Sequence, residues 1–150
     1  MAQTALAISF VDAKIEYSTD GAAWNDISGE VNTVEVSGGD RNSGEIFTAA
    51  GDIPIITFGK LNPWDVSCTV VYTESATEAF ERLRGFHQAD GGTSLQLRWA
   101  PIGSGTGNSQ YTCGTSKLTS FEMPGGEVGG GEPLSVAFVQ RTPSITKGTT

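Results

Sequence analysis

Chemically reactive side chains are scarce in this 150-residue sequence, which contains a single histidine and only two cysteines. The lone histidine, His87, excludes a histidine-rich metal site. Cys68 and Cys113 fall in phase with apolar neighbours, which predicts two buried free thiols rather than a Cys–His nucleophile. A disulfide between them remains an alternative. We therefore predict that the protein is not an enzyme and binds no cofactor.

Long apolar runs are also missing. No stretch approaches the roughly 20 apolar residues of a membrane span. The first ten residues lack the early Lys or Arg of a secretory signal. We expect a soluble protein that is made in a reducing cytoplasm and does not insert into a membrane.

Basic residues are outnumbered, because nine Lys and Arg stand against 17 Asp and Glu and give a formal net charge of −8. Residues 1–60 hold nine of the acids and three of the bases. Since phosphate contacts require Lys and Arg, this balance argues against tight binding of nucleic acid. Asp20, Asp26 and Glu30 match a calcium loop only loosely, and we predict no metal site.

What the sequence does contain is alternation of apolar and polar residues, which is typical of β-strands. It predicts a mainly β (α+β) fold, an antiparallel β-sandwich or partly closed barrel with one α-helix at about residues 75–88. We expect a single domain over residues 1–140 and a flexible tail over 141–150. The predicted core residues are Trp24, Val34, Val36, Cys68, Val70, Tyr72, Phe80, Leu83, Leu97 and Trp99.

The helix carries its own local signals. Ser75 and Glu78 form the pattern of a capping box, in which each side chain bonds a free backbone N–H near the helix start. Glu78 and Arg82 stand at i,i+4 spacing, which favours an ion pair.

A long arm loop is predicted at about residues 38–52, a stretch rich in small and polar residues. Structureless segments of this length are uncommon inside compact domains and tend to be functional. The adjoining segment 53–58 contains a proline, which indicates an edge strand. The predicted contact residues of the arm are Arg41, Glu45, Ile46, Phe47 and Asp52.

Seven segments of the sequence together carry a family likeness. They are Tyr17–Trp24, Asp26–Arg41, Ser43–Thr48, Gly51–Ile56, Gly59–Trp64, the strand Val66–Glu74 and the helix Ala76–Phe86. In these segments the sequence resembles the siphophage major tail tube proteins. The likeness covers about residues 13–100 well and the C-terminal third mainly by strand order.

The resemblance implies β-sandwich subunits that form hexameric rings, stacked into a hollow tail tube through which phage DNA leaves. It implies further partners, the tape measure, tail tip and tail terminator proteins, and a place in the virion after assembly in the bacterial host cytoplasm. Carboxylates along the channel would repel the phosphates of double-stranded DNA. The candidate lumen-facing residues are Glu35, Asp40 and Asp65.

Two alternatives remain open from the sequence. Trp24, Trp64 and Trp99 could form a stacking platform in a carbohydrate-binding or other ligand-binding β module. The chain could also be another virion or secretion-tube component with the same fold.

Overall fold

A computed structural model describes residues 3–4 and 6–150, and within them the chain is mainly β with one helix. The alternating segments become strands, as the sequence predicts, so the mainly β prediction is confirmed. The elements are β1 (Lys14–Ser18), β2 (Asn25–Asp26), β3 (Val31–Gly38), β4 (Arg41–Ile46), β5 (Ile55–Leu61), β6 (Trp64–Val71), α1 (Ala79–Gln88), β7 (Gln96–Ala100), β8 (Ser109–Cys113), β9 (Leu118–Phe121), β10 (Ser135–Thr142) and β11 (Ile145–Thr149).

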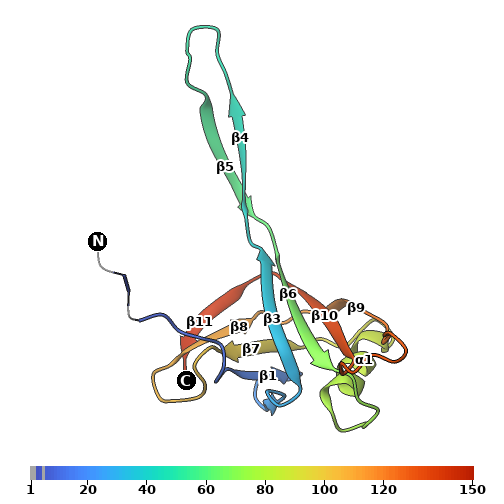
Figure 1. Cartoon of the computed structure of the whole chain (residues 1–150). Coiled ribbons are helices and arrows are strands. Elements are labelled where there is room, and N and C mark those ends of the chain that lie inside the picture. The colour runs from blue at the N-terminus through green and yellow to red at the C-terminus, as the bar shows by residue number, and fades with distance from the viewer. Residues whose placement is uncertain (1–2, 5) are drawn as a thin grey trace.

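Two antiparallel sheets pack face to face. One has the strand order β11-β8-β7-β1-β2 and the other the order β3-β6-β10-β9. In Figure 1 the strands of the second sheet run steeply across those of the first. No sheet of the described residues closes into a barrel, so the sandwich form of the prediction holds. The third sheet, β4-β5, stands apart from both.

The core lies between the two sheets and is closed on one side by α1. In β6 the alternate residues Val66, Cys68 and Val70 are buried, as expected for a strand that is covered on one face. Phe80 and Leu83 of α1 complete the core. Of the other predicted core residues, Leu97 and Trp99 are buried, and Val34 and Tyr72 are partly buried against the core.

Two predicted core positions differ from the prediction. Val36 is 40% exposed, because it lines an open cleft between the two sheets and is not packed against the other sheet. Trp24 is half-buried on the outer side of the five-stranded sheet, where the guanidinium of Arg98 lies 3.8 Å from the centre of its ring. A cation over an aromatic face replaces core packing there.

The start of α1 is capped from a distance and not by a local capping box. The Glu78 side chain makes no cap hydrogen bond, and the Ser75 hydroxyl lies beside the hydroxyl of Thr77. Instead, the backbone N–H of Ala79 donates to the carboxylate of Glu30, an acid favoured at this helix end. The predicted Glu78–Arg82 pair is also wrong, since Arg82 donates to the hydroxyl of Tyr17 at 3.0 Å.

The C-terminal residues are ordered as strands, so the predicted flexible tail over 141–150 is wrong. Arg141 and Thr142 end β10, and β11 then pairs along its whole length with β8, from Ile145 opposite Cys113 to Thr149 opposite Ser109. The strand β11 is held at the sheet edge by backbone hydrogen bonds, which do not require a row of apolar side chains. The pattern of apolar residues therefore did not predict it.

Candidate functional site: an arm, a polar sheet face and an apolar cleft

A two-stranded arm projects from the domain (Figure 1). It consists of β4 and β5, which continue the neighbouring strands β3 and β6 outward. The predicted loop over residues 38–52 is therefore wrong in its first half, because 41–46 form a strand. The pattern hid this strand because both faces of the arm are exposed, which leaves no alternation between buried and solvated sides.

The arm leaves the domain through a glycine joint. Gly38 and Gly39 have positive φ angles of 81° and 71°, which favour glycine. A Cβ atom at Gly39 would lie 2.2 Å from Cζ2 of Trp64, and one at Gly38 would lie 2.5 Å from the carbonyl oxygen of Pro63. The N–H of Gly39 donates to that same oxygen at 3.1 Å. Only glycine fits this crossing from sheet to arm.

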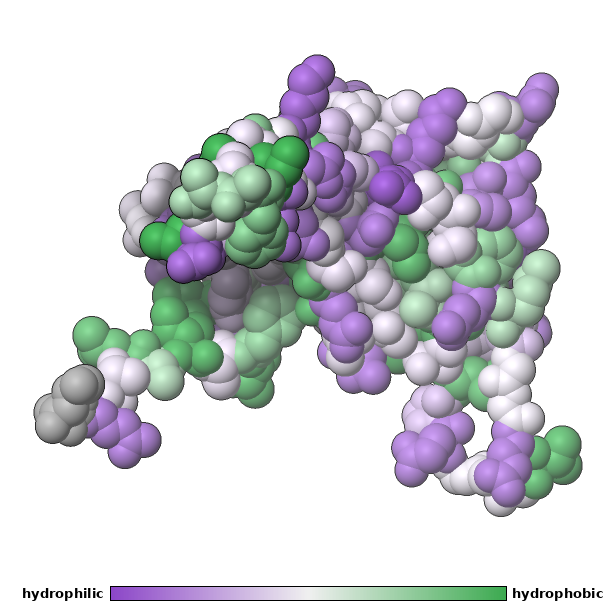
Figure 2. Space-filling view, turned by 90° about the horizontal axis from the view of Figure 1, so that it is seen from above, coloured by the Kyte–Doolittle hydropathy of each residue, from purple (hydrophilic) through white to green (hydrophobic). Residues whose placement is uncertain are grey.

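Apolar side chains are exposed on both faces of the arm. Paired residues share a face, so Ile56 lies beside Glu45, and Ile46 lies beside Ile55 on the opposite face. Figure 2, which looks down onto the arm, shows apolar atoms at its near end. The large apolar residues exposed on the arm are Ile46, Phe47, Ile53, Ile55, Ile56, Phe58 and Leu61.

The predicted contact residues of the arm fall at different levels along it. Arg41 stands at the base, where its Nη1 donates to the carbonyl of Gly59 at 3.0 Å. Glu45 and Ile46 occupy opposite faces of β4 near its end. Phe47 and Asp52 belong to the exposed turn that joins the two strands. The structure therefore spreads these residues along a projection and does not gather them into one pocket.

Most side chains on the outer face of the four-stranded sheet, away from the core, are small or polar. Glu35 lies directly opposite Ser67, and Ser37 opposite Asp65, so the two acidic strands share this face. The sequence indicated both polar rows but not that they adjoin. Asp40 is separate, since it lies beyond the sheet at the base of the arm.

One cation on this same face was missed. Arg141 of β10 pairs in register with Asp65, so the charges of the face partly oppose one another. The sequence predicts a tail at this residue, and only the long-range β6–β10 register places it on the face of the sheet.

An apolar cleft of about 370 Å³ opens between the two sheets beside the base of the arm. Trp99 and Tyr111 stack within it, with their ring centres 5.8 Å apart. The sequence predicts a tail where β11 lies, so it does not reveal the two lining residues of that strand, and the pattern around Tyr111 in β8 gives no sign of a cleft. The lining residues are Val36, Trp64, Trp99, Tyr111, Ile145 and Lys147.

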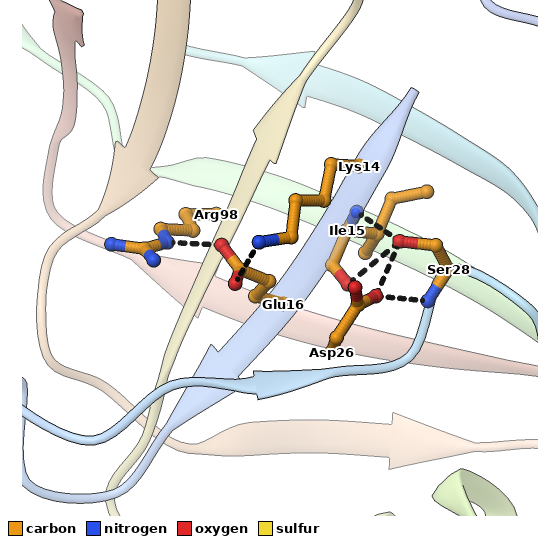
Figure 3. Close-up of polar contacts among 6 residues, drawn as sticks. All are labelled: Lys14, Ile15, Glu16, Asp26, Ser28 and Arg98. Carbon is orange, nitrogen blue, oxygen red and sulfur yellow. Dashed lines mark hydrogen bonds and ion pairs between the residues drawn. The ribbon is translucent and has the colours of Figure 1, made fainter. Parts of the chain in front are cut away.

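On the outer face of the five-stranded sheet, a buried carboxylate holds two cations (Figure 3). Glu16 accepts from Nζ of Lys14 at 2.9 Å and from Nε of Arg98 at 2.6 Å. Burial raises the pKa of this carboxyl, but the hydrogen bonds and charges of Arg98 and Lys14 outweigh it, so the pKa lies below its ordinary value of 4.5. Beside it, Asp26 accepts from the hydroxyl and backbone N–H of Ser28. The network ties β1 to its neighbours.

The described residues contain no cluster of three or more His, Cys, Asp or Glu placed to hold a metal ion. Asp20 accepts from the N–H groups of Ala22 and Ala23 at 2.8 Å, so it caps its own turn. Cys68 and Cys113 are buried and free, and burial raises the pKa of both thiols to about 12. Across the described residues, no helix has the length and apolar character needed to cross a membrane.

Known proteins were compared with the chain by sequence and by structure. No protein-family model and no curated protein matches the sequence. The structure is similar to a chain of the sheath-tube complex of PVC, an extracellular contractile injection system, with a TM-score of 0.69 and 10% identity over 97% of this chain and 94% of that one.

Two further solved structures agree. A chain of the SPP1 tail tube has a TM-score of 0.68 and 14% identity, with 96% of this chain and 80% of that one covered. A chain from the tail of an empty GTA particle has a TM-score of 0.62 and 15% identity, with 99% of each covered. At such identities the likeness concerns the fold: the chain has the fold of phage tail tube proteins.

Proposed function

We propose that this protein is the structural subunit of a phage tail tube and assembles with copies of itself into stacked hexameric rings. The observation that carries the proposal is the arm, which exposes seven large apolar side chains away from the domain. Exposed apolar surface of this extent marks interaction sites. The shared fold with chains of tail tubes supports this reading.

The four-stranded sheet supplies the surfaces for ring closure. Its outermost strands are β3 and β9, and each presents backbone groups that no strand of the same chain pairs in the described residues. Pairing of β3 in one copy with β9 in the next would continue the sheet around a ring. Repeated six times, this contact closes a channel whose wall is the four-stranded sheet.

The small polar face of that sheet is the proposed lumen lining. Glu35 and Asp65 lie on it, and Asp40 would stand at its rim. Arg141 lies on the same face opposite Asp65, so the excess of carboxylates there is small, but the formal charge of −8 on each subunit gives the whole ring −48. A ring of this sign repels DNA phosphates, which suits passage without adhesion.

The same function defines partners and location. The subunit would be assembled in the bacterial host cytoplasm, become part of the virion tail, and contact tape measure, tail tip and tail terminator proteins. The protein would not be an enzyme, because its function would lie in the surfaces through which subunits contact one another.

Removal of the arm tests the proposal. Deleting residues 41–61 and inserting Asn-Gly between Asp40 and Asn62 leaves a two-residue turn of the kind that closes hairpins. The N–H of Asn62 already donates to the carbonyl oxygen of Asp40 at 2.8 Å, which is the bond that closes such a turn. Every residue of β4 and β5 is exposed, so the deletion removes no core residue.

We expect concentrated wild-type protein to form rings or tubes under negative-stain microscopy, and the shortened protein to stay monomeric with native circular dichroism. A wild-type protein that remains monomeric at every concentration contradicts the proposal. Tubes formed by the shortened protein would show that the arm is not the assembly element.

A second candidate is the tube of a contractile injection system, favoured by the likeness to the PVC sheath-tube complex. A sheath around tubes isolated from the producing cells would support it. The three tryptophans of the ligand-binding alternative do not form one platform, since Trp24 lies under Arg98 while Trp64 and Trp99 line the cleft.

A further inference from the structure

The cleft beside the arm is unfilled although its lining is apolar and aromatic. Its openness follows from topology, since β3 and β11 are the edge strands on either side of it. Lys147 stands at the cleft and makes no ion pair among the described residues. An occupant should therefore combine apolar side chains with a carboxylate.

One face of the arm has this combination. Phe58 and Ile56 lie two residues apart along β5, so they point to the same side, and they are 73% and 55% exposed. Glu45 of β4 lies directly opposite Ile56 on this face and is likewise without an ion pair in the described chain.

The other face lacks a charge. It presents Ile46 and Ile55 in register, followed by Gly44 opposite Thr57. This face could fill an apolar space but would leave Lys147 without a counter-charge.

We infer that the cleft receives the arm of a second copy, with Phe58 and Ile56 against the aromatic floor and Glu45 paired with Lys147. The occupant belongs to another copy because the arm projects away from its own domain (Figure 1). This inference rests on the proposed self-assembly and specifies which face of the arm docks and where.

Charge reversal tests the pairing on the full-length protein. Glu45→Lys and Lys147→Glu each replace attraction by repulsion at exposed sites, so both variants should fold. We expect each to raise the protein concentration needed for assembly about fivefold to tenfold, and the double variant to restore it. Glu127→Lys, in the exposed loop between β9 and β10 and away from the arm and the cleft, is the matched control and should change the threshold less than twofold. Equal effects of all three single changes, without rescue in the double variant, would overturn the inference.

Cysteine pairing identifies the occupant. The native thiols are buried, so new exposed cysteines are the reactive ones. Mixed Glu45→Cys and Lys147→Cys proteins should give a covalent dimer under mild oxidation. Thr57→Cys tests the other face of the arm, and Ile8→Cys tests the exposed N-terminal segment as a rival occupant.

The outcomes separate the two proposals. Preferential linkage of positions 45 and 147 in assembled protein supports the inference. Tubes that assemble normally but link 147 to position 57 or 8, or to none of the three, overturn the inference and leave the tube function standing. A protein that does not self-associate overturns both.

Discussion

Replacing Gly39 by alanine tests whether the joint is as restricted as its geometry indicates. The φ of 71° lies in the left-handed region, where a residue with a Cβ loses about 1–2 kcal/mol. The new methyl would also lie 2.2 Å from Cζ2 of Trp64, far inside the usual carbon contact distance of about 3.5–4.0 Å. Forced overpacking of this kind typically costs about 1–3 kcal/mol.

The two effects together lower the free energy of unfolding by roughly 2–5 kcal/mol. Urea denaturation followed by circular dichroism measures it. Gly29→Ala is the matched control, because no atom lies within 4 Å of a Cβ there and the φ is not positive, so it should change stability by less than about 0.5 kcal/mol. Because Trp64 and the arm must move apart, we also expect Gly39→Ala to assemble poorly. Equal stability and equal assembly of the two variants would refute the account of the joint.

Three further predictions concern the domain. Glu16→Gln should destabilise the protein by about 1.5–3 kcal/mol at pH 7, because it leaves Arg98 without its buried partner. Since the pKa of Glu16 is lowered in the folded state, its contribution is present above about pH 4.5 and is lost as the pH falls, so urea unfolding at pH 3 should show a smaller difference from wild type. Cys68 and Cys113, with pKa values of about 12, should resist a thiol reagent at pH 8 until urea unfolds the chain, and rapid labelling of native protein would contradict their burial. Leu83→Ala should cost about 2–5 kcal/mol in the same unfolding assay without altering the arm, and a cost below 1 kcal/mol would place α1 outside the core.

Sequence reasoning succeeded where one side of an element is covered. The alternation in β6 is visible because Val66 and Cys68 face the other sheet while their neighbours do not. It failed where neither side is covered, as in β4, or where a strand forms by backbone pairing at an edge, as in β11.

The features that the sequence did not predict at the candidate site also depend on distant parts of the chain. Val36 has the correct phase for the core, but it lines the open cleft between the two sheets and stays 40% exposed. Lys147 is a candidate contact residue only because it lines a cleft whose other walls come from strands distant in the sequence. The local sequence around α1 also cannot predict that Glu30 caps the helix, since Glu30 is 49 residues away from Ala79.

The arm leaves the domain at one end only, whereas the cleft that we assign to it lies on the domain itself. When two different surfaces of the subunit contact each other, the subunits join head to tail and the assembly has a direction. An incomplete assembly would then present unused arms and open clefts as two chemically different surfaces. A protein that covers the unused arms would need an apolar groove, and one that covers the clefts would need an apolar projection with an acidic side chain. The growing assembly would thus select different partners by chemistry alone.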